Sequence, residues 1–317
     1  MRLGGHSRPE SLAGQKMGVM PILKRILVAT DLSAAAHRAV LRAGQLARQW
    51  GADLCLVRAR PDWHLFVHGR VTSSPVSHQD IAPGAGNPLR AVLAALEANF
   101  DIHAQCDSRL GRTSNVIAAM VAEHDPHLVV IGVRGEHDSG EIGPCLGGTA
   151  LELLRRIERP LLLVRGATAA AYTTSLVALG ADSALSQRTV LWGTALVQGG
   201  DCHVLHAYDL PYVERLRPGG AVRAVIEGQR QMRQAYEEAI TSVEEALCAT
   251  EGTVRLHRHA VRGKPIAMIL AEITLHAPQF VVIGKRDPQS PHVRQSMMDC
   301  VEFRIAYHAP VDVLMVP

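Results

Sequence analysis

The residues best placed to do chemistry follow two short apolar runs of the chain. Asp31 and Ser33 come after the run ILVAT, and Gly132 ends the run LVVIG. A second glycine, Gly135, stands three positions later and begins a Gly-rich segment. Glycines let backbone N–H groups approach an anion closely, and the N-terminus of a following helix adds a favourable dipole. The pattern therefore predicts a site that binds an anion such as a phosphate group.

Catalytic motifs are not indicated by residue type or spacing. No Ser-His-Asp arrangement and no Walker loop can be drawn from the sequence. The six cysteines form no Cys-x-x-Cys pair, so neither a Cys-paired zinc site nor a thioredoxin-type motif is expected. We expect the cysteines to be reduced and mostly buried, as in a cytoplasmic protein. The protein is therefore predicted not to be a dedicated enzyme.

Two histidines alternate within the segment LHRHA. His257 and His259 share one face if this segment is a strand, because side chains alternate along a strand. Two imidazoles on one face can be half of a metal site, but the sequence does not identify a third ligand. A strand face that is solvated or covered by a helix is the simpler interpretation, so we predict no metal site.

Composition limits the classes of protein further. The 317 residues are 47% hydrophobic and 20% charged, which is enough to build a core. A net charge of +3 and 4% aromatic residues argue against a nucleic-acid-binding protein. No apolar run reaches the roughly 18 residues that a membrane span needs. Residues 1–21 lack the apolar core of a signal peptide, and we expect them to form a disordered extension.

The chain contains an internal duplication. Residues 111–134 read GRTSNVIAAMVAEHDPHLVVIGVR, and residues 263–286 read GKPIAMILAEITLHAPQFVVIGKR. A period of about 150 residues is the size of a whole domain and not of a solenoid repeat. We therefore predict two copies of one domain, at residues 22–166 and 173–317, joined by a short Ala/Thr linker.

Each copy alternates short β-rich runs with amphipathic helical stretches. The first copy has expected strands at residues 23–29, 53–59, 101–107, 127–132 and 161–165. The second has them near 175–180, 201–207, 253–260, 279–284 and 311–316. Continuously apolar runs such as LVVI and LLLV are typical of parallel strands that are covered on both faces. The order predicts two doubly wound α/β domains, each with a five-stranded parallel sheet.

Three motifs carry a family resemblance over nearly the whole chain. VATDLS, GRTSNVI and VVIGVRG with its Gly-rich continuation resemble the universal stress protein family, here as a tandem pair. The resemblance implies a Rossmann-like sheet of order 3-2-1-4-5. It also implies ATP binding, with Mg²⁺ as an accompanying ion, by an Asp after the first strand and a G-x-x-G-x9-G-[S/T] loop after the fourth. Those strand ends meet at the switch point where such sheets bind ligands.

The resemblance assigns seven residues of the first copy to the nucleotide. They are Asp31 at the adenine or ribose, Val57 at the base, Gly132, Arg134 and Gly135 at the start of the phosphate loop, and Gly148 and Thr149 at its end. Cys145 stands where the family pattern has a glycine, so the loop is two or three residues longer. Lengthening a loop costs little entropy, and binding is still predicted.

The second copy departs from the nucleotide-binding pattern. Gly180 or Ala181 stands in the place of Asp31, and Asp287 replaces Gly135. Residues 291–305 have a helical period where the Gly-rich loop belongs, with a proline in the predicted first turn. We therefore expect the second copy to be structural or sensory.

These observations favour a stress-response regulatory protein that binds ATP in its first copy. A nucleotide-free scaffold that acts through protein partners is the alternative, and a slow ATPase is a weaker one. The last strands, 161–165 and 311–316, are apolar sheet edges, which favour pairing. Family members commonly dimerise through this strand. We predict that the two strands lie antiparallel, side by side, in an intramolecular pseudo-dimer.

Overall fold

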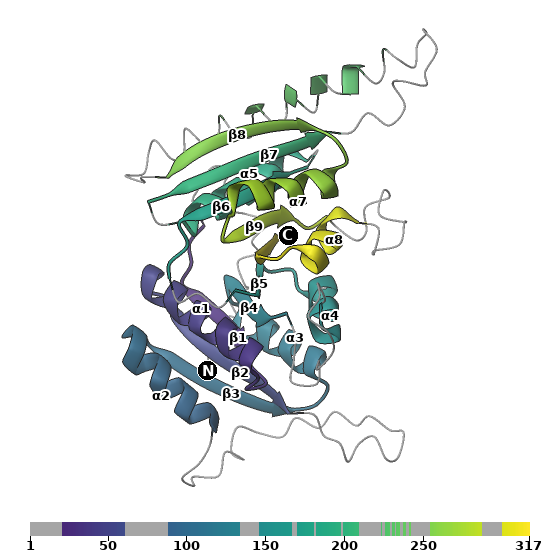
Figure 1. Ribbon diagram of the computed structural model, residues 1–317. Helices are drawn as coiled ribbons and strands as arrows, with labels where there is room; N and C mark the ends of the chain where they lie inside the picture. Colours follow the sequence, from purple (N-terminus) through teal and green to yellow (C-terminus); the bar gives the residue numbers. More distant parts are fainter. Residues whose placement is uncertain are drawn as a thin grey trace, which may run out of the picture.

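The computed structural model describes residues 21–60, 88–133, 146–166, 170–180, 182–197, 199–208, 254–286 and 300–317, with separate positions between 223 and 241. These residues form a ten-stranded sheet with helices on both faces (Figure 1). The predicted extension falls on residues 1–20, which lie outside the described part.

The first domain supplies one half of the sheet. Its strands are β1 (Arg25–Ala29), β2 (Asp53–Arg60), β3 (Ala104–Leu110), β4 (Leu128–Gly132) and β5 (Leu161–Val164). Its helices are α1 (Ala34–Trp50), α2 (Pro88–Phe100), α3 (Thr113–His124) and α4 (Gly148–Arg156). The strand order is β3-β2-β1-β4-β5, and the neighbours are parallel, as predicted.

The second domain repeats this arrangement. Its strands are β6 (Thr174–Leu179), β7 (Asp201–Tyr208), β8 (Arg255–Arg262), β9 (Phe280–Gly284) and β10 (Asp312–Val316). Its helices include α5 (Ser183–Ala195), α7 (Pro265–His276) and α8 (Val301–His308), and the described positions between 223 and 241 are also helical. The order β8-β7-β6-β9-β10 reproduces that of the first domain, so the tandem fold class is confirmed.

Two apolar cores lie on opposite faces of the sheet. One core joins residues of α1, α2 and α5, and the other joins residues of α3, α4, α7 and α8. The run LLLV of β5 is completely buried because successive side chains enter the two cores in turn. None of the helices in the described part of the chain is long and apolar enough to cross a membrane.

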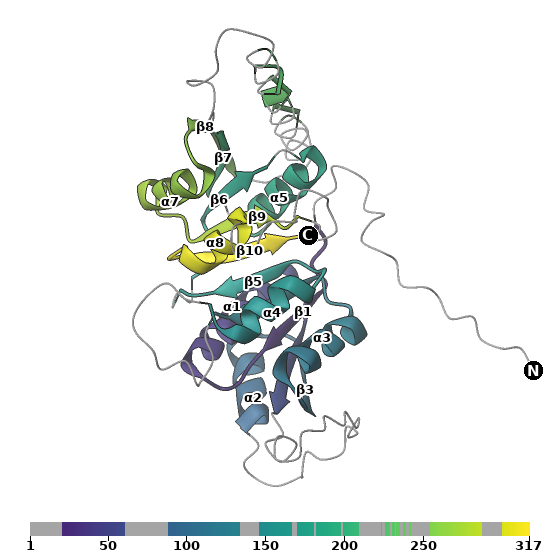
Figure 2. The same ribbon diagram turned by 90° about the vertical axis from the view of Figure 1, so that its right-hand side faces the viewer.

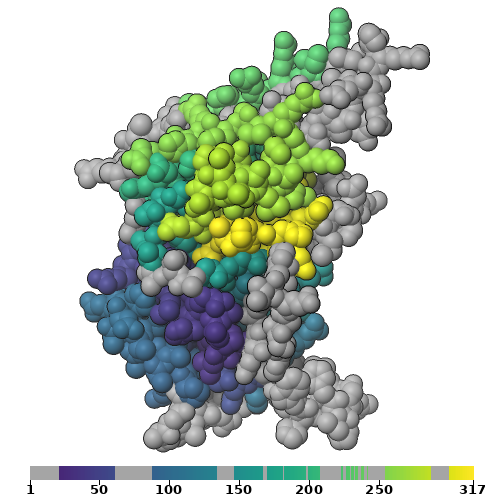
Figure 3. Space-filling view, viewed as in Figure 1, coloured from purple at the N-terminus to yellow at the C-terminus, as the bar shows by residue number. Residues whose placement is uncertain are grey.

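The two domains join through their last strands. β5 and β10 pair antiparallel, with Leu162 opposite Leu314. Figure 2 shows the two strands side by side where the domains meet, and in Figure 3 the yellow C-terminal segment packs between the light-green helix α7 and the first domain. The predicted intramolecular pseudo-dimer is therefore confirmed, and neither strand is left as an open edge.

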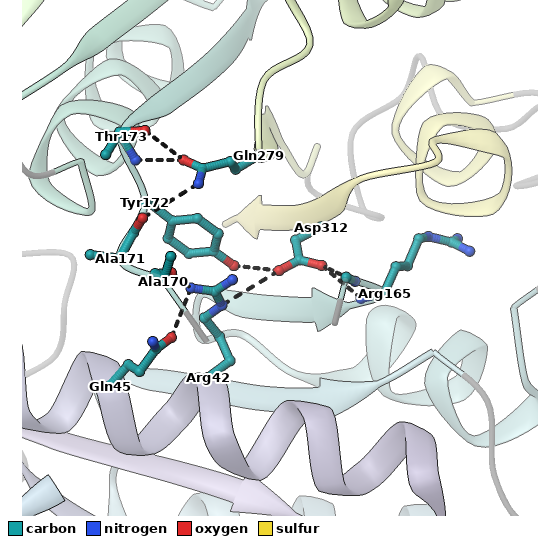
Figure 4. Close-up of polar contacts among 10 residues, drawn as sticks. Arg42, Gln45, Arg165, Ala170, Ala171, Tyr172, Thr173, Gln279 and Asp312 are labelled. Atoms are coloured by element: carbon teal, nitrogen blue, oxygen red, sulfur yellow. Dashed lines mark hydrogen bonds and ion pairs between the residues drawn. The ribbon is translucent and has the colours of Figure 1, made fainter. Parts of the chain in front are cut away.

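A buried carboxylate lies at this junction. Asp312, at the start of β10, is 1% exposed, and its Oδ1 accepts hydrogen bonds from the backbone N–H groups of Arg165 and Gly166 at 2.7 and 2.8 Å. Its Oδ2 accepts from the Tyr172 hydroxyl at 2.5 Å and lies 3.7 Å from Arg42 Nε (Figure 4). A buried charge is tolerated only when it is paired in this way.

The segment predicted as a linker contributes to the same junction. Tyr172 is 1% exposed, and its ring lies under the Arg42 guanidinium at 3.9 Å and 4.4 Å from the ring of Phe280. Burial, reinforced by Asp312, raises the pKa of Tyr172 well above its usual range, so the hydroxyl stays protonated as a donor. The described end of the linker is therefore a packed part of the domain interface.

One helix begins later than the sequence predicted. The apolar period suggested a helix over residues 291–305, but α8 begins at Val301. Cys300 is its N-cap, with extended backbone angles (φ −71°, ψ 138°), so the expected helical continuation through this residue is wrong. The remainder of the predicted helix, 291–299, lies outside the described residues.

Candidate functional site

The turn after β1 is held by its own side chains. Thr30 Oγ1 accepts a hydrogen bond from the Leu32 N–H, and Asp31 Oδ1 accepts one from the Ser33 N–H, both at 3.0 Å. Ser33 then caps α1 by accepting from the Ala36 N–H at 3.1 Å. Leu32 has a φ of +69°, a left-handed conformation that is uncommon for a residue with a side chain and typical of functional sites.

The end of β4 lies beside this turn. Val28 pairs with Val130, so continuing the register by two positions brings Thr30 level with Gly132. A Cβ at Gly132 would stand 2.9 Å from the carbonyl oxygen of Ala35, so the strand can approach the first turn of α1 only with glycine here. Asp31 and Gly132 therefore come together at the switch point between β1 and β4.

The N-terminus of α4 is tied to the same strand end. The Gly147 N–H donates to the carbonyl of Val133 at 2.8 Å, immediately after β4. No side chain of the described residues caps this helix, and Gly148 and Thr149 in its first turn are exposed. The first N–H groups of α4 are therefore in a position to meet an anion.

The other predicted residues fit less directly. Val57 is completely buried, and its carbonyl accepts a hydrogen bond from the Thr30 N–H at 2.9 Å. Because Ala29 pairs with Val57, the β2 residue level with Asp31 is Ala59. The β2 backbone beside the turn is therefore that of Ala59, two residues beyond the predicted Val57. The strand register that decides this cannot be read from the sequence. Arg134 and Gly135 lie outside the described residues.

The equivalent end of the second domain is built differently. Asp182 is the N-cap of α5 and accepts from the Leu185 N–H at 2.9 Å, as Ser33 does for α1. Counting back two positions from each cap makes Gly180 the equivalent of Asp31. A Cβ at Gly284, the equivalent of Gly132, would stand 2.6 Å from Leu185 Cγ, so an apolar side chain lies at this strand end. The second domain thus lacks the carboxylate of the first.

A group of histidines in the second domain was not predicted from the sequence. His203 of β7, His257 and His259 of β8 and His276 of α7 form what we call the histidine cluster. His203 Nδ1 lies 3.0 Å from His259 Nε2, and the His203 ring is 4.0 Å from that of His276 and 4.8 Å from that of His257, centroid to centroid. His257 and His259 share a face, as predicted, and α7 lies over it.

The environment disfavours the charged form of two members of this cluster. Burial, reinforced by the neighbouring imidazoles, lowers the pKa of His203 to about 4. Burial also lowers the pKa of His259, again reinforced by His276. A neutral imidazole retains a nitrogen lone pair, which is the form that accepts a hydrogen bond or binds a metal.

The fold and the turn define a tandem pair of doubly wound α/β domains with a candidate anion site at one switch point. The universal stress protein family model matches residues 23–165 and again residues 171–317. The chain therefore belongs to the universal stress protein family, a family of stress-response proteins. Curated protein sequences, by contrast, include no match to it.

Solved structures that cover more than 90% of this chain share its two-domain fold. A universal stress protein from Archaeoglobus fulgidus is 16% identical with a TM-score of 0.62, covering 92% of this chain and 97% of its own. A functionally unknown protein from Pseudomonas aeruginosa is also 16% identical, with a TM-score of 0.60 and coverage of 94% and 93%. A universal stress protein in complex with cAMP is 22% identical over 45% of this chain and 98% of its own, with a TM-score of 0.33.

Proposed function

We propose that this protein is a stress-response regulator whose first domain binds one adenine nucleotide, ATP with Mg²⁺, at the switch point between β1 and β4. The observation that carries the proposal is the meeting of Asp31, Gly132 and the first turn of α4 at one end of the sheet. Ligands of doubly wound sheets bind outside the carboxyl ends of the strands at this position.

Each residue is assigned to the part of the nucleotide that its chemistry suits. The Asp31 carboxylate accepts hydrogen bonds from the ribose hydroxyls or the adenine amino group. The backbone of Gly132, the first N–H groups of α4 and the Thr149 hydroxyl face the phosphates, where the helix dipole favours negative charge. The backbone at Ala59 is the part of β2 that meets the base, in place of Val57. Arg134 and Gly135 complete the phosphate loop in this proposal.

Regulation is proposed in preference to catalysis because the side chains of the turn hold the turn itself. Asp31 Oδ1 is bonded to the Ser33 N–H, and Ser33 is used as a helix cap. These contacts position a ligand and do not place a proton acceptor or nucleophile at a phosphate. Slow ATP hydrolysis remains the weaker alternative, and phosphate release by the purified protein measures it.

The nucleotide-free scaffold is the competing hypothesis, since a turn and a helix cap also account for Asp31 and Ser33. Denaturing the purified full chain and identifying any released small molecule by mass separates the two. Calorimetric titration with Mg-ATP should then give one site per chain, because Gly180 replaces Asp31 in the second domain. Absence of both bound nucleotide and measurable binding would favour the scaffold, and two equal sites would contradict the assignment to one domain.

A further inference from the structure

We propose that the second domain binds one divalent transition-metal ion of the zinc type through His203, His259 and His276, with Glu272 as the fourth ligand. The three imidazoles come from β7, β8 and α7, and Figure 1 shows α7 lying across the strands of this domain. Their candidate ligand atoms all lie within 4.8 Å of one another. This site is independent of the proposed nucleotide site in the first domain.

The distances suit a small tetrahedral ion. Zinc binds imidazole nitrogen at about 2.0–2.1 Å, which separates two ligands of a tetrahedron by about 3.3 Å. His203 Nδ1 and His259 Nε2 are already 3.0 Å apart. The remaining ligand atoms lie within 4.8 Å of one another, and the proposed site requires rotations of the partly exposed, stacked imidazole rings to bring them to this separation.

Glu272 provides the independent observation that points to a ligand. It stands one helical turn before His276, is 9% exposed, and its Oε2 lies 2.9 Å from His276 Nε2. Neither buried atom has a hydrogen-bond partner of acceptable geometry among the described residues. A buried carboxylate oxygen and a buried imidazole nitrogen without such partners are costly, and a shared metal ion would satisfy both.

The neighbouring residues hold the cluster in place. His257 Nε2 lies 2.7 Å from Asp201 Oδ1, and the same carboxylate pairs with Arg255 at 2.9 Å. The His257 ring stacks on His203 with an interplanar angle of 19°. Outer-shell contacts of this kind orient metal ligands and contribute to affinity. Asp201 and His257 are therefore positioning residues for His203.

The first domain offers an internal comparison. Sheet register and the repeat place Cys55, Asp107 and His124 at the positions of His203, His259 and His276. There the Arg109 guanidinium donates to Asp107 at 2.8 Å, and burial raises the pKa of the Cys55 thiol to about 12, which disfavours the thiolate that binds metals.

In the second domain, the position of Arg109 is taken by Val261, which brings no charge. The second copy thus replaces a thiol and a carboxylate paired to arginine with imidazoles. That exchange creates a metal site in one domain only.

The donor set selects the class of metal. Imidazole with one carboxylate suits Zn²⁺, and Cu²⁺ or Ni²⁺ compete by intrinsic affinity, whereas Mg²⁺ and Ca²⁺ prefer oxygen donors. The ion would join α7 to β7 and to β8, the outermost strand of this half of the sheet. Binding to the folded state alone would stabilise that edge.

The test uses the full chain after removal of metals with a chelator. Titration with Zn²⁺ against a chromophoric competitor should show one tight site per chain, and Co²⁺ should give the visible absorption of a four-coordinate ion. His259→Gln and His276→Gln should each weaken Zn²⁺ binding by more than about 100-fold, beyond the usual cost of losing an outer-shell partner. His103→Gln, at a histidine whose side chain is 78% exposed in the first domain, is the control and should bind normally.

Two outcomes would overturn the metal site: no stoichiometric Zn²⁺ binding by the wild-type chain, or equal affinity in the His259, His276 and His103 variants. Circular dichroism checks that the variants are folded, and if one is not, His203→Gln provides the same comparison. Glu272→Gln should weaken binding and change the Co²⁺ spectrum. An unchanged spectrum and affinity would remove Glu272 from the ligand set.

Discussion

Asp31 makes a structural contact within the turn and is also a proposed ligand of the nucleotide. One carboxylate oxygen accepts a hydrogen bond from the Ser33 N–H. In the resulting turn, Leu32 has a φ of +69°. Backbone strain of this kind persists only where surrounding contacts impose it, and it is concentrated at functional sites. The charge of Asp31 is not needed for the turn, because a neutral amide oxygen also accepts from an N–H.

Asp31→Asn therefore separates the two roles. The amide retains an acceptor for Ser33 but loses the negative charge, so Mg-ATP affinity should fall by about 1–3 kcal/mol, roughly 5- to 150-fold. Isothermal titration of the full chain measures this change, and the thermal unfolding midpoint should stay near that of the wild type. Asp182→Asn, at the helix cap of the second domain, is the matched control. Unchanged affinity in Asp31→Asn would mean that the residue only supports the turn.

Gly132 is required by packing whether or not a nucleotide binds. A methyl group there would stand 2.9 Å from the Ala35 carbonyl oxygen, so β4 and α1 would have to separate. Gly132→Ala should lower the free energy of unfolding by about 1–3 kcal/mol, as overpacking does, in a denaturant titration. Gly148→Ala meets no atom within 4 Å and should be close to neutral. Equal stability of the two variants would contradict this packing role.

At the scale of elements, the sequence predicts best what is local. The runs LVVI and LLLV became β4 and β5, because continuous apolar character is what a two-sided sheet requires. The third strand was expected at residues 101–107 but spans Ala104–Leu110. Asp101 has a φ of +52°, and pairing with β2 sets the strand's start. Neither the positive φ of Asp101 nor the pairing with β2 can be predicted from the spacing of apolar residues.

The candidate sites differ in the same way. Asp31 and Gly132 were predictable because each directly follows its own strand, and the strand order alone brings them together. The histidine cluster depends on three elements separated along the chain, and on a register that places Leu205 opposite His259. The sequence signal for the cluster would have been that His203 lies opposite His257 across β7 and β8. That signal can be used only when the register of the two strands is already known.

Asp312 offers a prediction for the junction between the two halves. Asp312→Asn leaves Arg42, whose side chain is 3% exposed, without its buried anion. Removing one partner of a buried ion pair typically costs about 3–5 kcal/mol, and denaturant unfolding of the full chain should show a loss of this size. Asp53→Asn, at a carboxylate that is 71% exposed, should change stability little. A loss no larger than that of Asp53→Asn would show that the pair does not stabilise the junction.

At the scale of the whole molecule, duplication turns two edges into one continuous sheet. β5 and β10 are both completely buried between their neighbours, and a single chain keeps the partners together at high effective concentration. This pairing gives the second domain a structural role that does not depend on a nucleotide site. The proposed metal site would add a ligand of its own to that domain, and the protein would then have one nucleotide-binding and one metal-binding half.

Removing residues 173–317 tests the role of the second domain in covering β5. The deletion exposes the apolar strand Leu161–Val164, whose unpaired backbone groups favour pairing with another copy. We expect the remaining first domain to form homodimers through antiparallel β5 strands, at twice the fragment mass by light scattering. The backbone amides of Leu161 and Leu163, which face β10 in the full chain, should then be protected from hydrogen exchange in a concentration-dependent manner, whereas the full chain protects them at any concentration. A fragment that stays folded and monomeric would show that β5 needs no partner strand.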